Sequence, residues 1–125
     1  MRRLKRRQDF LRVARIGRKW AAPGLVLQCA PALAGGAGVP AVGFTASRRV
    51  GGAVARNRAR RRLRAAADQV IATSARPDLD YVLIARTATL SRRFDRLAAD
   101  LMTALAKLGA LAEQAAGEAP AERRQ

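Results

Sequence analysis

The sequence contains no histidine, one cysteine and five aromatic residues among its 125 positions. Without histidine, the chain lacks the commonest general base and the commonest metal ligand of proteins. The single Cys29 has no partner for an internal disulfide, which fits a reducing compartment, so we expect a cytoplasmic protein. No run of about 18 apolar residues is present, and no membrane-spanning helix is therefore expected.

Acidic residues are also scarce: nine Asp and Glu stand against 25 Lys and Arg, which gives a formal net charge of +16. Residues 1–20 hold nine of the basic residues, and residues 48–64 hold eight more without any acid. The rest of the chain is neutral. A neutral body with two basic blocks is typical of a protein that binds a polyanion. Nucleic acid is favoured, because the planar guanidinium of arginine suits phosphate contacts, and an acidic membrane surface is the next possibility.

The amino-terminal basic block has a second interpretation, because transit peptides are also rich in arginine and poor in acid. This block lacks serine and contains Asp9, and it continues into a predicted helix without a small-residue cleavage site. We therefore expect it to be a basic amino-terminal arm that belongs to the folded protein.

The length fits one domain, and we expect a single RNA-binding domain over residues 1–112 followed by a disordered tail at 113–125. Periodicity and turn residues predict helices at 8–17, 53–73 and 92–111 and strands at 24–30, 41–47 and 81–85. This order, α-β-β-α-β-α, predicts an α+β fold, a two-layer α/β sandwich with its helices on one face of the sheet. We expect the first two strands to form an antiparallel hairpin and the third to lie parallel to the second.

The helix predicted at 53–73 has an unusual density of charge. Its apolar residues recur at helical spacing and comprise Ala59, Leu63, Ala66, Ala67, Val70 and Ile71. Six of the nine residues at 56–64 are arginine, and no acid occurs between Arg48 and Ala67. A solvated helix face normally alternates charges of opposite sign. The density of arginine therefore predicts a polyanionic partner that offsets the repulsion.

Three stretches of the sequence together resemble one protein family. They are VGFTASRRVGGAVARNRARRRLR at 42–64, RLKRRQDFLRVARIGRKW at 3–20 and YVLIAR at 81–86. The first, a strand end followed by a glycine-containing loop and an Arg-Asn-Arg helix, is similar to the signature of the bacterial ribonuclease P protein subunit. The other two are similar to the opening helix and the closing strand of that family. The resemblance covers roughly residues 3–110.

The resemblance implies a left-handed βαβ crossover around the Arg-Asn-Arg helix, whereas a right-handed crossover is the general expectation. It also implies that the protein binds the catalytic RNA of ribonuclease P and the single-stranded 5′ leader of precursor tRNA. The residues implied to bind the catalytic RNA are Arg48, Arg49, Arg56, Asn57, Arg58, Arg60, Arg61, Arg62 and Arg64. Those implied to line a leader-binding cleft, between the first helix and the sheet, are Phe10, Val13, Arg12 and Lys5.

The implied activity is hydrolysis of precursor tRNA that leaves a 5′ phosphate, by a ribonucleoprotein with one protein per RNA. Its Mg²⁺ ions and attacking water would be held mainly by the RNA. The residues agree with this division, because a protein metal nuclease needs clustered carboxylates and the nine acids here are scattered along the chain. We therefore assign no catalytic residue and no metal ligand to the chain itself.

The sequence departs from the family pattern at several positions. Ala14 and Gln28 stand where the family commonly has aromatic residues, and Gly52 replaces a residue that is often asparagine. Stacking on an aromatic side chain contributes about 1–3 kcal/mol per base, so leader binding here is expected to depend more on charge. Trp20 is either a compensating aromatic or a hydrophobic anchor after the first helix.

Another class of protein shares the same charge and fold class. It is a structural, ribosomal-type RNA-binding protein without leader recognition. Stimulation of precursor tRNA cleavage at low Mg²⁺ distinguishes the two hypotheses, and displacement from anionic vesicles by RNA tests the membrane alternative.

Overall fold

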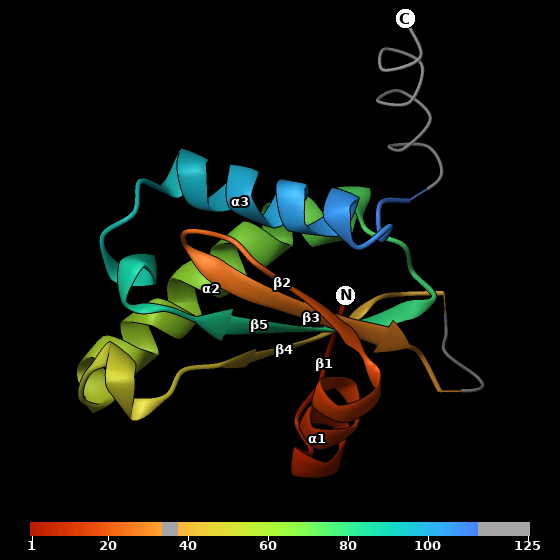
Figure 1. Ribbon diagram of the computed structural model, residues 1–125, viewed down its shortest axis with the longest axis horizontal. Helices are drawn as coiled ribbons and strands as arrows, with labels where there is room; N and C mark the ends of the chain where they lie inside the picture. Colours follow the sequence, from red (N-terminus) through yellow and green to blue (C-terminus); the bar gives the residue numbers. More distant parts are fainter. Residues whose placement is uncertain (34–37, 113–125) are drawn as a thin grey trace, which may run out of the picture.

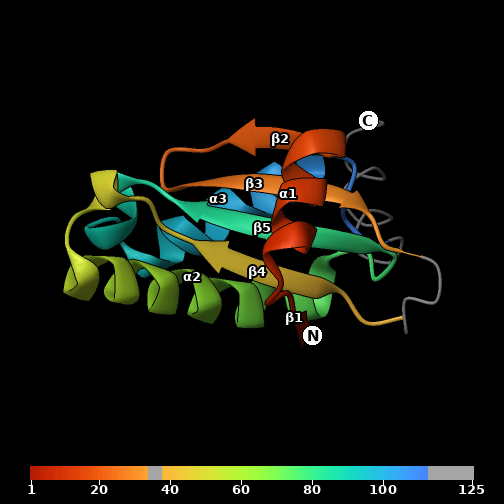
Figure 2. The same cartoon turned by 90° about the horizontal axis from the view of Figure 1, so that it is seen from below.

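The computed structural model describes residues 1–33 and 38–112, and it has a five-stranded sheet of order β1-β4-β5-β3-β2 (Figures 1 and 2). The strands are β1 (Arg2–Arg3), β2 (Arg18–Ala21), β3 (Leu25–Pro31), β4 (Ala41–Thr45) and β5 (Leu79–Ala85). The helices are α1 (Arg7–Ile16), α2 (Ala53–Ser74) and α3 (Phe94–Lys107), with short 3₁₀ helices η1 (Arg48–Val50) and η2 (Thr87–Leu90). The predicted α+β class is confirmed. The predicted tail at 113–125 lies outside the described residues.

Strand β5 occupies the centre of the sheet. It pairs in parallel with β4 and antiparallel with β3, so the expected parallel arrangement is confirmed. The expected hairpin between β3 and β4 is wrong, because β5 lies between them. Six of the seven residues of β5 are buried, which suits a position covered on both faces of the sheet.

Helices α2 and α3 cover one face of the sheet, the upper face in Figure 1. The apolar stripe predicted for α2 is confirmed, since all six of its residues are buried in the main core. In α3, Leu97, Leu101 and Leu105 are buried in the same core, whereas Phe94 at the start of the helix is 37% exposed.

Helix α1 lies on the opposite face of the sheet, so the expectation that all helices share one face is wrong (Figure 2). Because side chains alternate between the faces of a strand, β5 directs Tyr81 and Leu83 to the main core and Val82 toward α1. Val82 joins a second, small core cluster with Leu4 and Val13. Strand β5 is therefore buried by helices from both sides.

The chain passes from β4 to its parallel neighbour β5 through η1 and α2. The left hand that the resemblance implies for this crossover stays a prediction. Between η1 and α2, Gly51 has a φ of 143°, a conformation that favours glycine. No helix in the described ranges is long and apolar enough to cross a membrane.

Candidate nucleic-acid interface

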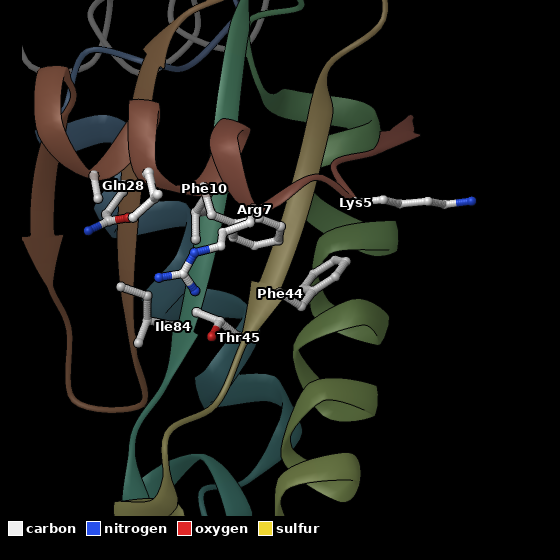
Figure 3. Close-up of a pocket in the computed structure, with 10 residues that line it drawn as sticks. Lys5, Arg7, Phe10, Gln28, Phe44, Thr45 and Ile84 are labelled. Carbon is white, nitrogen blue, oxygen red and sulfur yellow. The ribbon is translucent and has the colours of Figure 1, made fainter.

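A cleft of about 460 Å³ lies between α1 and the sheet (Figure 3). Its lining comes from α1, from the segment just before this helix and from three strands. It comprises Lys5, Arg7, Phe10, Leu11, Ala14, Gln28, Phe44, Thr45, Val82 and Ile84. Apolar side chains form most of this surface, and the only charged residues that line it are basic. In Figure 3 the guanidinium of Arg7 projects over the strands, while Lys5 points outward past β4. Such a surface suits an anionic chain with apolar faces.

Helix α1 packs against the sheet through a close contact between the Phe10 ring and Gly43 of β4. A Cβ atom added to Gly43 would lie 2.5 Å from the Phe10 ring, so glycine at this position lets the ring approach the backbone of β4. Phe10 is half-buried, and it forms one wall of the cleft. The ring therefore both anchors the helix and presents apolar surface to the cleft.

The four residues that the resemblance placed in the cleft divide into two pairs. Phe10 and Lys5 line it. Val13 is fully buried beneath α1, in the second core cluster. Arg12 does not line the cleft either: it forms a salt bridge with Asp80 and donates a hydrogen bond of 3.1 Å to the carbonyl oxygen of Pro31. These last two residues hold α1 in place instead of lining the cleft.

Ala14 and Gln28 line the cleft, at the two positions where the resemblance leads one to expect aromatic residues. Phe44 also lines it, although neither the charge pattern nor the motif pointed to this residue. Alternation along β4 indicates a core residue, and Phe44 is indeed 7% exposed, but it lies near the sheet edge, where the cleft reaches it. Trp20 does not line this cleft, and the ammonium nitrogen of Lys107 lies 5.6 Å from the centre of its ring.

Two arginines adjoin Phe44 and connect the cleft with α2. The guanidinium carbon of Arg3 lies 5.3 Å from the centre of the Phe44 ring, and that of Arg64 lies 5.9 Å from it. Both distances are within the range of cation–π attraction. The basic surface of α2 therefore continues, through Arg64 and Arg3, to the edge of the cleft.

The basic residues of α2 have different surroundings. Asn57, Arg58 and Arg61 are exposed, as are Arg48 and Arg49 in the preceding η1. Arg56, Arg60 and Arg64 recur every fourth residue and are half-buried along one flank. Within that flank, Arg60 donates a hydrogen bond of 2.6 Å to the amide oxygen of Asn57. The Nε atoms of Arg56 and Arg64 are buried without a hydrogen-bond partner among the described residues.

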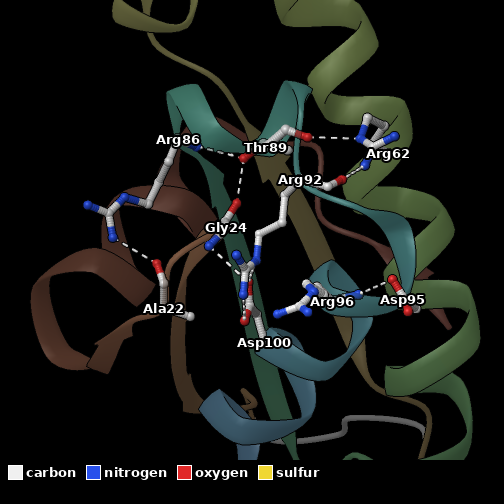
Figure 4. A network of polar contacts seen from close by, with 9 residues as sticks. All are labelled: Ala22, Gly24, Arg62, Arg86, Thr89, Arg92, Asp95, Arg96 and Asp100. Carbon is white, nitrogen blue, oxygen red and sulfur yellow. Dashed lines mark hydrogen bonds and ion pairs between the residues drawn. The ribbon is translucent and has the colours of Figure 1, made fainter.

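Arg62 has a different environment from the other arginines of α2. Its Nε donates a hydrogen bond of 2.8 Å to the carbonyl oxygen of Thr89, and its Nη2 donates to the carbonyl oxygen of Arg92 (Figure 4). Although the resemblance placed Arg62 on the RNA-binding surface, its guanidinium is directed toward the segment that contains η2.

The positive charge of α2 is not neutralised within the described ranges. The ion pairs found there use Arg12, Arg76, Arg92 and Arg93, and none of them includes an arginine of α2. In the same ranges, no three acidic or cysteine side chains gather as a metal-binding group would require. The arrangement is therefore suited to binding an anion.

Comparison with known proteins identifies relatives along most of the chain. A family model described as Ribonuclease P matches residues 1–109. The Ribonuclease P protein component of Paramagnetospirillum magneticum is 55% identical over 122 residues, covering 94% of this chain and 90% of the relative. That of Ruegeria pomeroyi is 51% identical over 108 residues, covering 86% of each chain.

Solved structures show the same fold. The RNase P protein of Staphylococcus aureus superposes with a TM-score of 0.70 at 24% identity, covering 86% of this chain and 97% of that one. The RNase P protein from Thermotoga maritima superposes with a TM-score of 0.68 at 21% identity, covering 82% of this chain and 94% of that one.

Proposed function

The chain belongs to the ribonuclease P protein family, and we propose that it binds the catalytic RNA of ribonuclease P and the 5′ leader of precursor tRNA. In this role it assists the endonucleolytic cut that leaves the mature 5′ phosphate of tRNA. The observation that carries the proposal is the uncompensated charge of α2 next to a cleft whose charged lining is entirely basic.

Helix α2 and η1 are proposed to bind the catalytic RNA. Their exposed side chains Arg48, Arg49, Arg58 and Arg61 have no acidic partner in the described parts of the chain, so their positive charge is available to phosphates. Each phosphate that a protein neutralises releases counterions, which makes binding weaken steeply as salt is added.

The cleft is proposed to hold the single-stranded leader. Arg7 and Lys5 supply positive charge for the leader backbone, and Phe10 and Ile84 supply apolar surface against which bases can pack. Because Ala14 and Gln28 replace two expected aromatics, electrostatic contacts are proposed to contribute more than stacking here.

The chemical step is proposed to belong to the RNA subunit, with which one copy of this protein associates. Magnesium ions at the cleavage site would activate the attacking water and stabilise the leaving oxygen. The described residues bring together no carboxylate cluster that would fit such ions, so no step is assigned to a protein-held metal. The contribution of this chain is to bind and orient two RNAs.

The test is cleavage of a precursor tRNA by bacterial ribonuclease P RNA at low Mg²⁺, with and without the protein. The protein should stimulate cleavage. Absence of stimulation, together with RNA binding that persists, would instead favour a structural RNA-binding protein.

Leader recognition can be tested with two matched variants of α1, one inside the cleft and one outside it. Arg7 lines the cleft, whereas Arg15 is exposed on the same helix without lining it. Arg7→Ala should weaken binding of precursor tRNA to the holoenzyme several-fold and leave mature tRNA unaffected, and Arg15→Ala should change neither. Equal effects of the two variants on precursor tRNA would refute the assignment of the cleft.

A further inference from the structure

The first turns of α2 have little hydrophobic contact with the core. Ala59 is the first buried residue of this helix, so the six residues 53–58 contain none. These six residues include the Arg-Asn-Arg segment. Apolar burial, which fixes most helices in proteins, therefore cannot by itself fix the direction of this part of α2.

Three backbone carbonyls of the segment 89–92 accept hydrogen bonds from arginines of α2. Arg62 donates to the carbonyl oxygens of Thr89 and Arg92, as described above, and Arg58 donates at 3.5 Å to that of Leu90. The two contacts of Arg62 leave from different nitrogens of one planar guanidinium. This geometry needs arginine, because the single ammonium nitrogen of lysine cannot reproduce it.

The segment that accepts these bonds is itself firmly held, as Figure 4 shows. Thr89 is fully buried, and its hydroxyl donates at 2.6 Å to the carbonyl oxygen of Gly24 and accepts at 2.8 Å from the amide of Arg86. The Arg92 side chain forms two hydrogen bonds, of 2.5 and 3.0 Å, with the carboxylate of Asp100. Asp100 is buried and also accepts a hydrogen bond of 2.9 Å from the amide of Gly24. Arg62 thus connects α2 to a segment that is hydrogen-bonded both to Gly24, the residue before β3, and to Asp100 of α3.

We propose that Arg62 is a positioning residue, which braces the amino-terminal half of α2 against the segment 89–92 and does not itself contact the RNA. Bracing from this side would direct the exposed Arg61 outward, where the proposed function needs it. The RNA-binding part of this inference rests on the proposed function, whereas the bracing part concerns the protein alone.

The test uses two substitutions at Arg62 and one at its neighbour. Arg62→Lys keeps the charge but removes the planar pair of donors, and Arg62→Gln removes both. Arg61→Gln is the matched control, because Arg61 is an exposed arginine one residue away on the same helix. Each full-length variant is compared with the wild type by hydrogen exchange and by titration with ribonuclease P RNA over a range of salt concentrations.

Both Arg62 variants should lower the exchange protection of the Thr89, Ser91 and Arg92 amides by about fivefold or more, because each lost hydrogen bond is worth about 1 kcal/mol. Both should also weaken RNA binding several-fold at every salt concentration without changing its salt dependence. Arg61→Gln should instead leave exchange unchanged and reduce the log–log salt slope by roughly 0.7–0.9, as expected for one lost phosphate contact.

Three results would overturn the inference. Wild-type behaviour of Arg62→Lys, with a reduced salt slope for Arg62→Gln, would make Arg62 a phosphate contact. Lower exchange protection with unchanged RNA affinity would make its role structural only. If the wild type itself fails to bind the RNA, the proposed function is wrong. In that case, unchanged hydrogen exchange in Arg62→Lys would separately exclude the positioning role of Arg62. If Arg62→Gln does not fold, the exchange and RNA-binding measurements on Arg62→Lys alone still test the inference.

Discussion

Arg12 on α1 and Asp80 on β5 form a salt bridge on the face of the sheet that carries the cleft, with side chains only 15% and 6% exposed. The pair joins the helix that forms one wall of the cleft to the strand at the centre of the sheet. Together with the contact between Phe10 and Gly43, it fixes the position of α1 and with it the width of the cleft. Binding geometry and stability are therefore coupled in this region.

Removing Arg12 should destabilise the fold more than removing the charge of Asp80. Arg12→Gln leaves a buried carboxylate without its cation, which costs about 3 kcal/mol or more of the free energy of unfolding. Asp80→Asn removes the charge, and Arg12 keeps its bond to the Pro31 carbonyl. Urea denaturation measures both effects, with Arg15→Gln as the control on the exposed face of α1. Similar losses for Arg12→Gln and Arg15→Gln would show that the pair contributes nothing.

Filling the space at Gly43 should displace α1. A Cβ atom at this position would lie 2.5 Å from the Phe10 ring, closer than van der Waals contact allows. Gly43→Ala is expected to destabilise the protein by about 1–3 kcal/mol, the usual cost of overpacking. Phe10→Leu in the same chain should recover part of this loss. Thermal unfolding of the two single variants and the double variant gives the coupling, and additive effects would contradict the contact.

The periodicity of the sequence predicted the elements that have a clear apolar pattern. Helix α2 was predicted at 53–73 and extends over Ala53–Ser74, and its whole buried stripe was identified. Strands β1 and β2 were missed because all their residues are exposed and show no alternation of buried and exposed positions. The hairpin prediction failed because strand pairing depends on where the distant β5 inserts, which local pattern does not encode.

The sequence suggested candidate residues for the interface, but it could not give the directions of their side chains. Arginine content and motif singled out Arg12 and Arg62, yet both side chains turn toward groups of the protein that are distant in sequence, at Asp80 and at the carbonyls of Thr89 and Arg92. Phe44 shows the opposite case, since alternation indicates a core residue and only its place near the sheet edge brings it to the cleft. For Arg12, Arg62 and Phe44 alike, the surroundings of the side chain depend on tertiary contacts, which the local sequence does not encode.

The protein should lose stability in alkaline solution. Burial raises the pKa of the Cys29 thiol and of the Tyr81 hydroxyl above their ordinary values of 9.0 and 10.0. Above these values the unfolded chain releases protons that the folded protein retains. The free energy of unfolding therefore falls with rising pH, by at most about 1.4 kcal/mol per pH unit for each group.

Tyr81→Phe separates the contribution of the tyrosine. The Tyr81 hydroxyl donates a hydrogen bond of 2.7 Å to the carbonyl oxygen of Arg76, so the variant should lose about 1 kcal/mol at pH 7. Above pH 10 the difference between the variant and the wild type should shrink, because the variant has no hydroxyl to ionise. Urea denaturation from pH 7 to pH 11 measures this, and Cys29→Ala tests the thiol in the same way. A constant difference across this range would exclude the tyrosine as a cause.

An aromatic residue at position 28 should strengthen leader binding. Gln28 lines the cleft on β3, and an aromatic side chain at this position can stack on a leader base. Gln28→Tyr is therefore expected to improve the affinity of the holoenzyme for precursor tRNA by about 1 kcal/mol or more, which corresponds to roughly fivefold. Affinity for mature tRNA, which has no leader, should not change. Trp20→Phe is the control, because Trp20 lies outside the cleft. Unchanged affinity of a stably folded Gln28→Tyr variant would mean that leader bases do not reach β3 and that the leader contacts only the basic rim formed by Lys5 and Arg7.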